Sequence, residues 1–150
     1  MARPGLSRGD LLLLAAILAV GGIVVSAYLT YEWYVSFSSS FCDISAYWSC
    51  TEVGRSSYAA IGGVPTAAVG LVGFLVLLGL VIVAFQGRAR VGPWSVDLWL
   101  LLFTGLGALL GLGLTLIEIF VIEHICILCA TGFALDLGTL AISLALRRAA

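Results

Sequence analysis

Four long stretches with almost no charged side chains constrain the fold of this chain more than any other feature. They cover residues 11–31, 56–86, 98–117 and 125–146. Each reaches the roughly 20 apolar residues that a helix needs to cross the hydrocarbon of a bilayer. Lipid offers the backbone no hydrogen-bond partner, and these stretches lack the alternation of barrel strands, so we expect helices. The sequence therefore predicts an all-α membrane protein in which four transmembrane helices form one bundle.

The composition supports this class. The 150-residue chain is 62% hydrophobic and 10% charged, whereas soluble domains are about 25% charged. The expected spans are about 11–31, 64–86, 98–118 and 125–146, with one long loop of about 32–63. They leave no residues for a second domain, so residues 1–150 are expected to form a single domain. We expect no nucleic-acid partner, although the net charge of −1 says nothing about one by itself. No oligomeric state is predicted.

Arginine positions predict the orientation of the bundle. The chain has no Lys, and six of its seven Arg residues form three pairs: Arg3 with Arg8, Arg88 with Arg90, and Arg147 with Arg148. An even number of spans places both termini and the middle loop on one side, which the positive-inside rule makes the cytoplasm. We expect a multi-pass protein of the plasma membrane. The first span also has signal-peptide features, with Val25-Ser26-Ala27 as a cleavage site, but its long apolar core favours a retained helix.

The cysteines form two pairs on the predicted extracytoplasmic face. Cys42 and Cys50 lie in the polar loop, and Cys126 and Cys129 form Cys-Ile-Leu-Cys at the start of the fourth span. On a helix, Cα atoms three residues apart are about 5 Å apart, which is within disulfide range. The N–H groups exposed at a helix start favour negative charge, so the thiolate of Cys126 is expected to form more readily there. Outside the cytoplasm such thiols form and exchange disulfides.

Three interpretations of the cysteines follow from the residues alone. In a redox relay, the loop pair meets a soluble partner and the helix pair faces a lipid-soluble electron acceptor. Static disulfides would stabilise an external loop but give no reason for Cys-x-x-Cys at a helix start. A four-cysteine zinc site has the right number of ligands, but seven residues separate Cys42 from Cys50, which is wider than zinc-knuckle spacing. We favour the relay and expect no metal.

Taken together, these motifs resemble the vitamin K epoxide reductase family, which includes animal enzymes and bacterial or archaeal homologues that make disulfides. The resemblance covers nearly the whole chain. It rests on the four spans and on Phe41-Cys42-Asp43, Cys50, Ser56, Tyr58-Ala59, Gly63-x-Pro65, Gly70 and Cys126-x-x-Cys129.

The resemblance implies an order of electron transfer. A reduced thioredoxin-like protein outside the cytoplasm attacks Cys42, Cys50 passes the electrons to Cys126, and Cys129 stands next to a membrane quinone of the ubiquinone or menaquinone type. Bacterial members are often fused to a thioredoxin-like domain. This chain has none, so its partner is expected to be a separate protein.

The resemblance also implies residues near the quinone. Ser56 matches a serine near the reactive cysteines, and its hydroxyl either stabilises a thiolate, binds the ring or caps local backbone. Thr66 stands at the position of a quinone-contacting Asn, and Phe133 at that of a Tyr in the animal enzymes. Thr66 can donate one hydrogen bond but Phe133 none, which argues against assuming an epoxide substrate. The alternatives are a quinone or vitamin K epoxide reductase whose main product is reduced quinone, and a structural membrane protein with static disulfides.

Several residues within the spans carry further expectations. Asp136 lies seven residues beyond Cys129 on the same helical face and is expected to face the bundle interior. We predict a neutral, hydrogen-bonded structural acid there, with proton delivery to reduced quinone as the alternative.

Gly107 and Gly111 predict close backbone approach of a neighbouring helix. The second helix is predicted to begin near Pro65, a residue type suited to the first helical position. The aromatic residues of the first outer loop indicate an interfacial belt or the rim of a ligand pocket.

Overall fold

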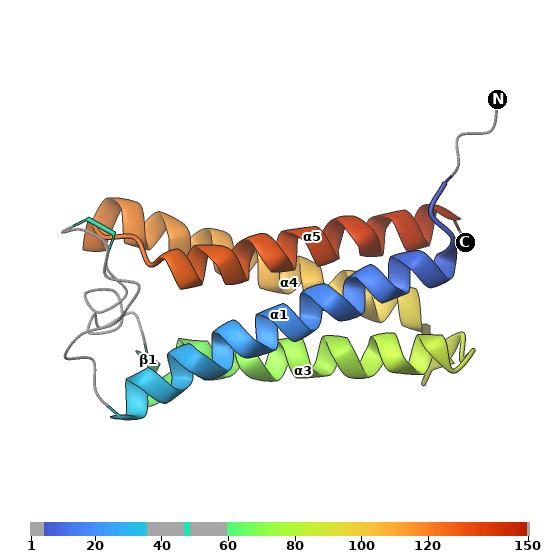
Figure 1. Ribbon diagram of the computed structural model, residues 1–150, viewed down its shortest axis with the longest axis horizontal. Helices are drawn as coiled ribbons and strands as arrows, with labels where there is room; N and C mark the ends of the chain where they lie inside the picture. The colour runs from blue at the N-terminus through green and yellow to red at the C-terminus, as the bar shows by residue number, and fades with distance from the viewer. Residues whose placement is uncertain (1–4, 36–46, 49–59, 150) are drawn as a thin grey trace.

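The computed structural model describes residues 5–35, 47–48 and 60–149. Its main elements are α1 (Arg8–Val35), α3 (Thr66–Phe85), α4 (Val96–Ile117) and α5 (Ile127–Ala149). One turn of π-helix, η2 (Glu118–Ile122), continues α4. Four helices are long and apolar enough to cross a membrane, which confirms the predicted four-helix membrane bundle. The start of α1, the end of α5 and the connection from α3 to α4 lie at one end of the bundle (Figure 1).

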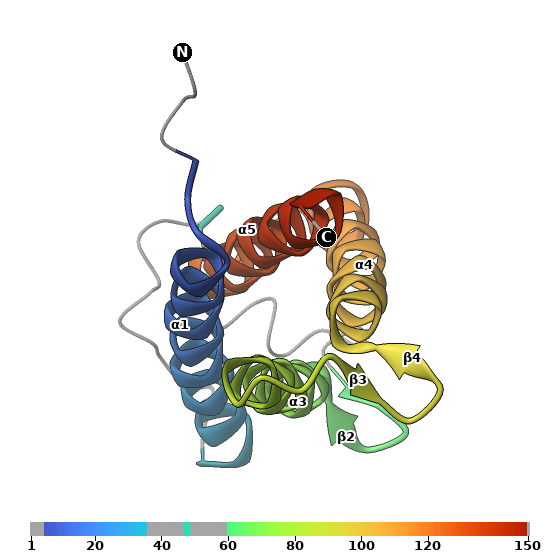
Figure 2. The ribbon, with the colours of Figure 1, turned by 90° about the vertical axis from the view of Figure 1, so that its right-hand side faces the viewer.

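The four helices form a ring. Helix α1 packs against α3 and α5, and α4 packs against the same two helices, as the end view in Figure 2 shows. Two short antiparallel hairpins precede helices: β1 (Ala60–Ile61) pairs with β2 (Val64–Pro65), and β3 (Arg90–Val91) pairs with β4 (Trp94–Ser95). The all-α prediction missed them because strands of two residues are too short to produce an alternating pattern.

The first hairpin determines where α3 begins. Its turn contains Gly62 and Gly63 with φ of 59° and 85°, a conformation that glycine adopts without the steric cost of a side chain. Pro65 has φ −64° and ψ 139° and is the N-cap of α3. The prediction that the second helix begins near Pro65 is confirmed, because α3 starts at Thr66, and the extended ψ of Pro65 keeps that residue paired in the hairpin.

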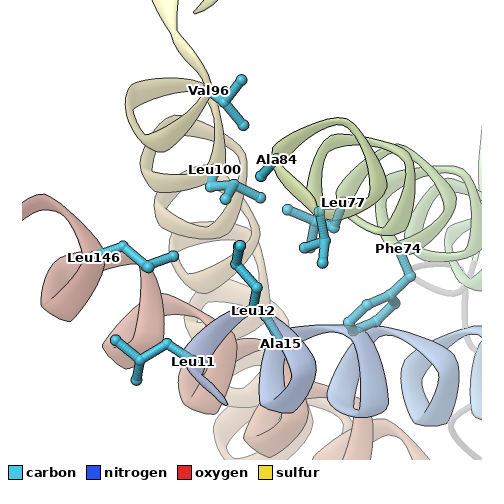
Figure 3. Packing of buried hydrophobic residues seen from close by; sticks show 10 residues of the cluster. Leu11, Leu12, Ala15, Phe74, Leu77, Ala84, Val96, Leu100 and Leu146 are labelled. Carbon is cyan, nitrogen blue, oxygen red and sulfur yellow. The ribbon is translucent and has the colours of Figure 1, made fainter. Parts of the chain in front are cut away.

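The end of the bundle that holds the chain termini is tightly packed. Figure 3 shows side chains from all four helices meeting there: Leu11, Leu12, Ala15, Phe74, Leu77, Val81, Ala84, Val96, Leu100 and Leu146. Close van der Waals contact of this kind is what holds helices together where lipid surrounds them. Outward-facing residues are also apolar, among them Leu109 and Phe120, which are 70% and 74% exposed. The outer surface of the bundle therefore suits a hydrocarbon environment.

An ion pair joins two helices at the same end. Arg8 donates through both terminal nitrogens to Asp97, with distances of 3.0 and 2.8 Å to the two carboxylate oxygens. Asp97 lies in the first turn of α4, where the helix dipole also favours a negative charge. Nearby, Trp99 donates its ring N–H to the carbonyl oxygen of Val91 at 2.9 Å. Tryptophan, whose apolar ring carries one polar N–H, is typical of the membrane–water interface.

Candidate functional site

Cys126 is the N-cap residue of α5. Its carbonyl oxygen accepts the N–H of Ala130 at 2.9 Å, and its Sγ accepts the N–H of Cys129 at 3.3 Å. The sulfur thus takes the place that a Ser, Thr or Asp oxygen usually fills at a helix start. The sulfur therefore lies at the positive end of the helix dipole. Cys126 is buried, Cys129 is partly buried, and no disulfide joins these two sulfurs.

Glu118 contacts Cys126 from the preceding helix. Its Oε2 accepts the backbone N–H of Cys126 at 3.2 Å, and the residue is only 6% exposed. Glu118 is the first residue of the π-helical turn η2, a geometry that is frequent at functional sites. Glu118 was not among the predicted site residues because the uncharged stretch ends at residue 117. The available signal was an acid followed by four apolar residues, since an ionisable group within a span marks a functional site by default.

The segment between the two loop cysteines contacts the residue that precedes Cys126. Ile125 donates its N–H to the carbonyl oxygen of Tyr47 at 2.9 Å, and Ile125 forms an isolated parallel bridge with Trp48. Residues 47–48 therefore lie beside the connection from α4 to α5, at the end of the bundle opposite the termini (Figure 1).

A cavity of about 440 Å³ lies inside the bundle next to Cys126 and Cys129. All four helices line it, and most of the lining is apolar. Its polar and ionisable lining residues are Ser26, Thr66, Thr115, Glu118, Cys126, Cys129 and Asp136. Phe133 lines the same cavity. The structure therefore brings Cys126, Cys129, Thr66 and Phe133 to one site, whose size and few polar groups suit a small ring-shaped ligand.

The cavity opens toward the outer surface between α3 and α4. Val69 and Val72 of α3 line it and are 46% and 59% exposed, and Leu106 and Leu110 of α4 line it and are 55% and 53% exposed. These residues face the cavity and the exterior at once. A ligand dissolved in lipid can therefore reach the cysteines from the side of the bundle.

The packed core closes the other end of the cavity. Phe74 belongs to the core and also lines the cavity. Its ring lies so close to Gly22 of α1 that a Cβ at that position would overlap it. The bundle is therefore solid toward the chain termini and hollow toward the cysteines, with Phe74 at the boundary.

Gly107 and Gly111 of α4 make room for side chains of α5. A Cβ at residue 107 would lie 2.9 Å from Oδ1 of Asp136, and a Cβ at residue 111 would overlap the ring of Phe133. The glycine pair is therefore closely packed, as predicted, but against side chains of α5 and not against its backbone. The space is filled by side chains that line the cavity rather than by the backbone of the neighbouring helix.

Asp136 faces the bundle interior and is 7% exposed. Within the described part of the chain, its Oδ2 is buried without a hydrogen-bond partner. The expectation of a hydrogen-bonded structural acid is therefore wrong for this oxygen, because the neighbouring surfaces are glycine and apolar side chains.

The remaining predicted site residues, Cys42, Cys50 and Ser56, lie outside the described residues, so their roles stay predictions. Among the aromatic residues of the first outer loop that the structure describes, Trp33 lines the cavity, whereas Tyr34 is 66% exposed.

Comparison with known protein families gives one match that spans most of the chain. A family model described as the vitamin K epoxide reductase family matches residues 13–144, from the first turns of α1 to the last turns of α5.

Proposed function

The chain belongs to the vitamin K epoxide reductase family, and we propose that it oxidises the thiols of an extracytoplasmic thioredoxin-like protein and passes the electrons to a membrane quinone. Family membership makes it a membrane oxidoreductase. The direction of electron flow, the protein partner and the quinone acceptor are our proposal.

The observation that carries the proposal is the cavity beside Cys126 and Cys129. Its volume of about 440 Å³ is in the range of small-molecule sites, and its opening between α3 and α4 faces the phase in which quinones dissolve. Thr66 offers a hydroxyl and Phe133 a flat apolar surface, so these residues fit a quinone ring with Cys129 beside it. The quinone supplies the capacity to accept two electrons and two protons.

The N-cap position gives Cys126 the properties that exchange requires. In thiol–disulfide exchange the sulfur attacks and leaves as a thiolate, and the N–H groups exposed at a helix start face negative charge favourably. When Cys126 and Cys129 form a disulfide, the two thiols lose two electrons and two protons and one S–S bond forms. Reduction of that disulfide by the loop pair returns both thiols, so the site can turn over.

The contact between Ile125 and residues 47–48 supports transfer from the loop pair to the helix pair. Trp48 bridges to Ile125, the residue before Cys126, and Cys50 follows Trp48 by two residues. Two trans peptide units reach at most about 7.6 Å between Cα atoms, so the tether from this contact to Cys50 is short. We propose the order Cys42, Cys50, Cys126, Cys129, with Ser56 near the reactive sulfurs.

The charge distribution supports an extracytoplasmic site. Arg8, Arg88, Arg90, Arg147 and Arg148 belong to the end of the bundle that holds the chain termini, and the cysteines of α5 belong to the other end. By the positive-inside rule the arginine end faces the cytoplasm. We favour disulfide formation over epoxide reduction because Phe133 has no hydroxyl to donate to an epoxide oxygen.

Replacement of single cysteines tests the proposal. With a small dithiol as reductant and a short-chain quinone as acceptor, Cys129→Ser should abolish quinone reduction, because no second sulfur remains to complete the disulfide. Cys42→Ser should retain dithiol-driven reduction and lose only the reaction driven by a reduced thioredoxin-like protein. Equal rates for wild type and Cys129→Ser would refute the assignment.

Alkylation trapping separates this function from a purely structural one. The fraction of alkylated Cys126 and Cys129 should rise when dithiol is added and fall when quinone is added. Cysteines whose alkylation ignores both reagents would instead belong to static disulfides.

A further inference from the structure

Asp136 places a polar group without a partner at the inner end of the cavity. The residue is 7% exposed, lines the cavity, and has an Oδ2 with no hydrogen-bond partner among the residues that the structure describes. Nearly all buried polar atoms in proteins have such a partner, because leaving one unpaired is destabilising. A ligand in the cavity that pairs with this carboxyl would remove that cost.

The position of Asp136 relative to Cys129 fits a ring between them. The two residues lie on one face of α5, seven positions and about 10.5 Å apart along the helix axis. Phe133 lies between them in sequence, and all three line the cavity. Leu135, next to Asp136, packs against the solid core. Cys129 is therefore at the outer end of the cavity and Asp136 is at its floor.

The carboxyl of Asp136 faces glycine and apolar side chains. Gly107 leaves room for it, with a hypothetical Cβ only 2.9 Å from Oδ1, and Phe74 and Phe103 line the cavity near its core end. An ionised carboxylate without a partner is costly in an apolar setting. The protonated acid carries one O–H, so it can donate one hydrogen bond to an acceptor in the cavity.

We propose, on the basis of the function proposed above, that Asp136 donates a hydrogen bond to one carbonyl oxygen of the quinone and so sets which edge of the ring faces Cys129. No covalent bond changes at Asp136. The two electrons and two protons that convert the quinone to hydroquinone come from the thiols of Cys126 and Cys129, which form a disulfide, so Asp136 keeps its own proton.

Two substitutions separate the hydrogen bond from the mere presence of a side chain. Asp136→Leu fills similar space without a donor, whereas Asp136→Asn keeps an N–H donor. With 2-methyl-1,4-naphthoquinone as acceptor and a small dithiol as reductant, Asp136→Leu should raise KM about five- to tenfold, the effect of losing one neutral hydrogen bond. Asp136→Asn should keep KM within about twofold of wild type.

A matched control lies one turn further along α5. Thr139 is fully buried and donates to the carbonyl oxygen of Leu135 at 2.9 Å, and it does not line the cavity. Thr139→Val should therefore leave KM unchanged. An equal rise in KM for Thr139→Val and Asp136→Leu would assign the effect to packing of α5 and overturn the proposal.

Infrared spectroscopy detects the hydrogen bond between Asp136 and the quinone carbonyl without turnover. The quinone, labelled with ¹³C at one carbonyl or the other, is bound to protein held in the disulfide form, and its carbonyl bands are recorded. One band should shift to lower frequency in wild type and Asp136→Asn and lose that shift in Asp136→Leu. A band that is the same in wild type and Asp136→Leu would overturn the proposal.

The two proposals fail in different ways. If wild-type protein reduces no quinone and binds none, the proposed function is wrong. If wild type reduces quinone normally and Asp136→Leu matches it in KM and in the carbonyl bands, only the role of Asp136 is wrong.

Discussion

Replacing Cys126 by Ser and by Ala should separate its structural role from its chemical one. In the structure its Sγ accepts the N–H of Cys129 at 3.3 Å, and the residue is 1% exposed. Serine keeps an acceptor at this N-cap position, whereas alanine leaves the N–H of Cys129 buried without one. Both variants should lose quinone reduction completely, because neither can form the disulfide with Cys129.

The size of the stability difference follows from the burial of the cap. Loss of an N-cap side chain costs about 0.5–2 kcal/mol, and a buried donor left unsatisfied costs about 1–3 kcal/mol. Water does not readily replace the lost acceptor at a site this buried. We therefore expect Cys126→Ala to be about 1–2 kcal/mol less stable than Cys126→Ser.

Unfolding in mixed micelles with increasing dodecyl sulfate, followed by helical circular dichroism, measures this difference. Cys129→Ala and Cys129→Ser provide the comparison, because the sulfur of Cys129 does not cap the helix, and the stability difference between these two variants should be smaller than the difference between the two variants of Cys126. Hydrogen exchange at the amide of Cys129 should be faster in Cys126→Ala than in Cys126→Ser. Equal stability and equal exchange for the Ala and Ser variants of Cys126 would refute the capping argument.

Two further predictions concern the walls of the site. Gly111→Ala should push the ring of Phe133 toward the cavity and raise KM for quinone, because a Cβ at residue 111 overlaps that ring. Phe133→Leu in the same chain should relieve the overlap and recover only part of the affinity, since leucine has no flat ring. Steady-state kinetics check this, and an unchanged KM in Gly111→Ala would contradict the overlap. Glu118→Gln should keep the free energy of unfolding of wild type, because an amide oxygen still accepts the N–H of Cys126. Glu118→Leu should lower the free energy of unfolding by about 1–3 kcal/mol. Unfolding curves that coincide for these two variants would show that this hydrogen bond contributes nothing to stability.

The fold could be predicted because each span is long and uniformly apolar. In lipid the backbone has only helices available for such segments, so composition and length were sufficient for the bundle. Details that depend on single residues were not predictable in the same way. The hairpin that Pro65 closes before α3 was not predicted, since strands of two residues leave no periodic signal.

The candidate site was predictable where a motif carries it. Cys126 and Cys129 stand three apart at a helix start, a spacing that already indicated thiol chemistry. Glu118 was missed because its place near Cys126 depends on a π-helical turn, which hydrophobic periodicity does not reveal. The packing of the Asp136 side chain depends on Gly107 of another helix, and the sequence contains no direct sign of that contact.

If the proposed site holds a quinone, the packed half of the bundle near the chain termini bears on which part of that quinone is recognised. Phe74 closes the cavity toward the termini, so an isoprenoid tail cannot continue along the bundle axis in that direction. The exposed valines of α3 and leucines of α4 offer a lateral path into the acyl chains. On that path the number of isoprene units lies outside the contacts of the protein, and discrimination among natural quinones is expected to fall to the substituents of the head group.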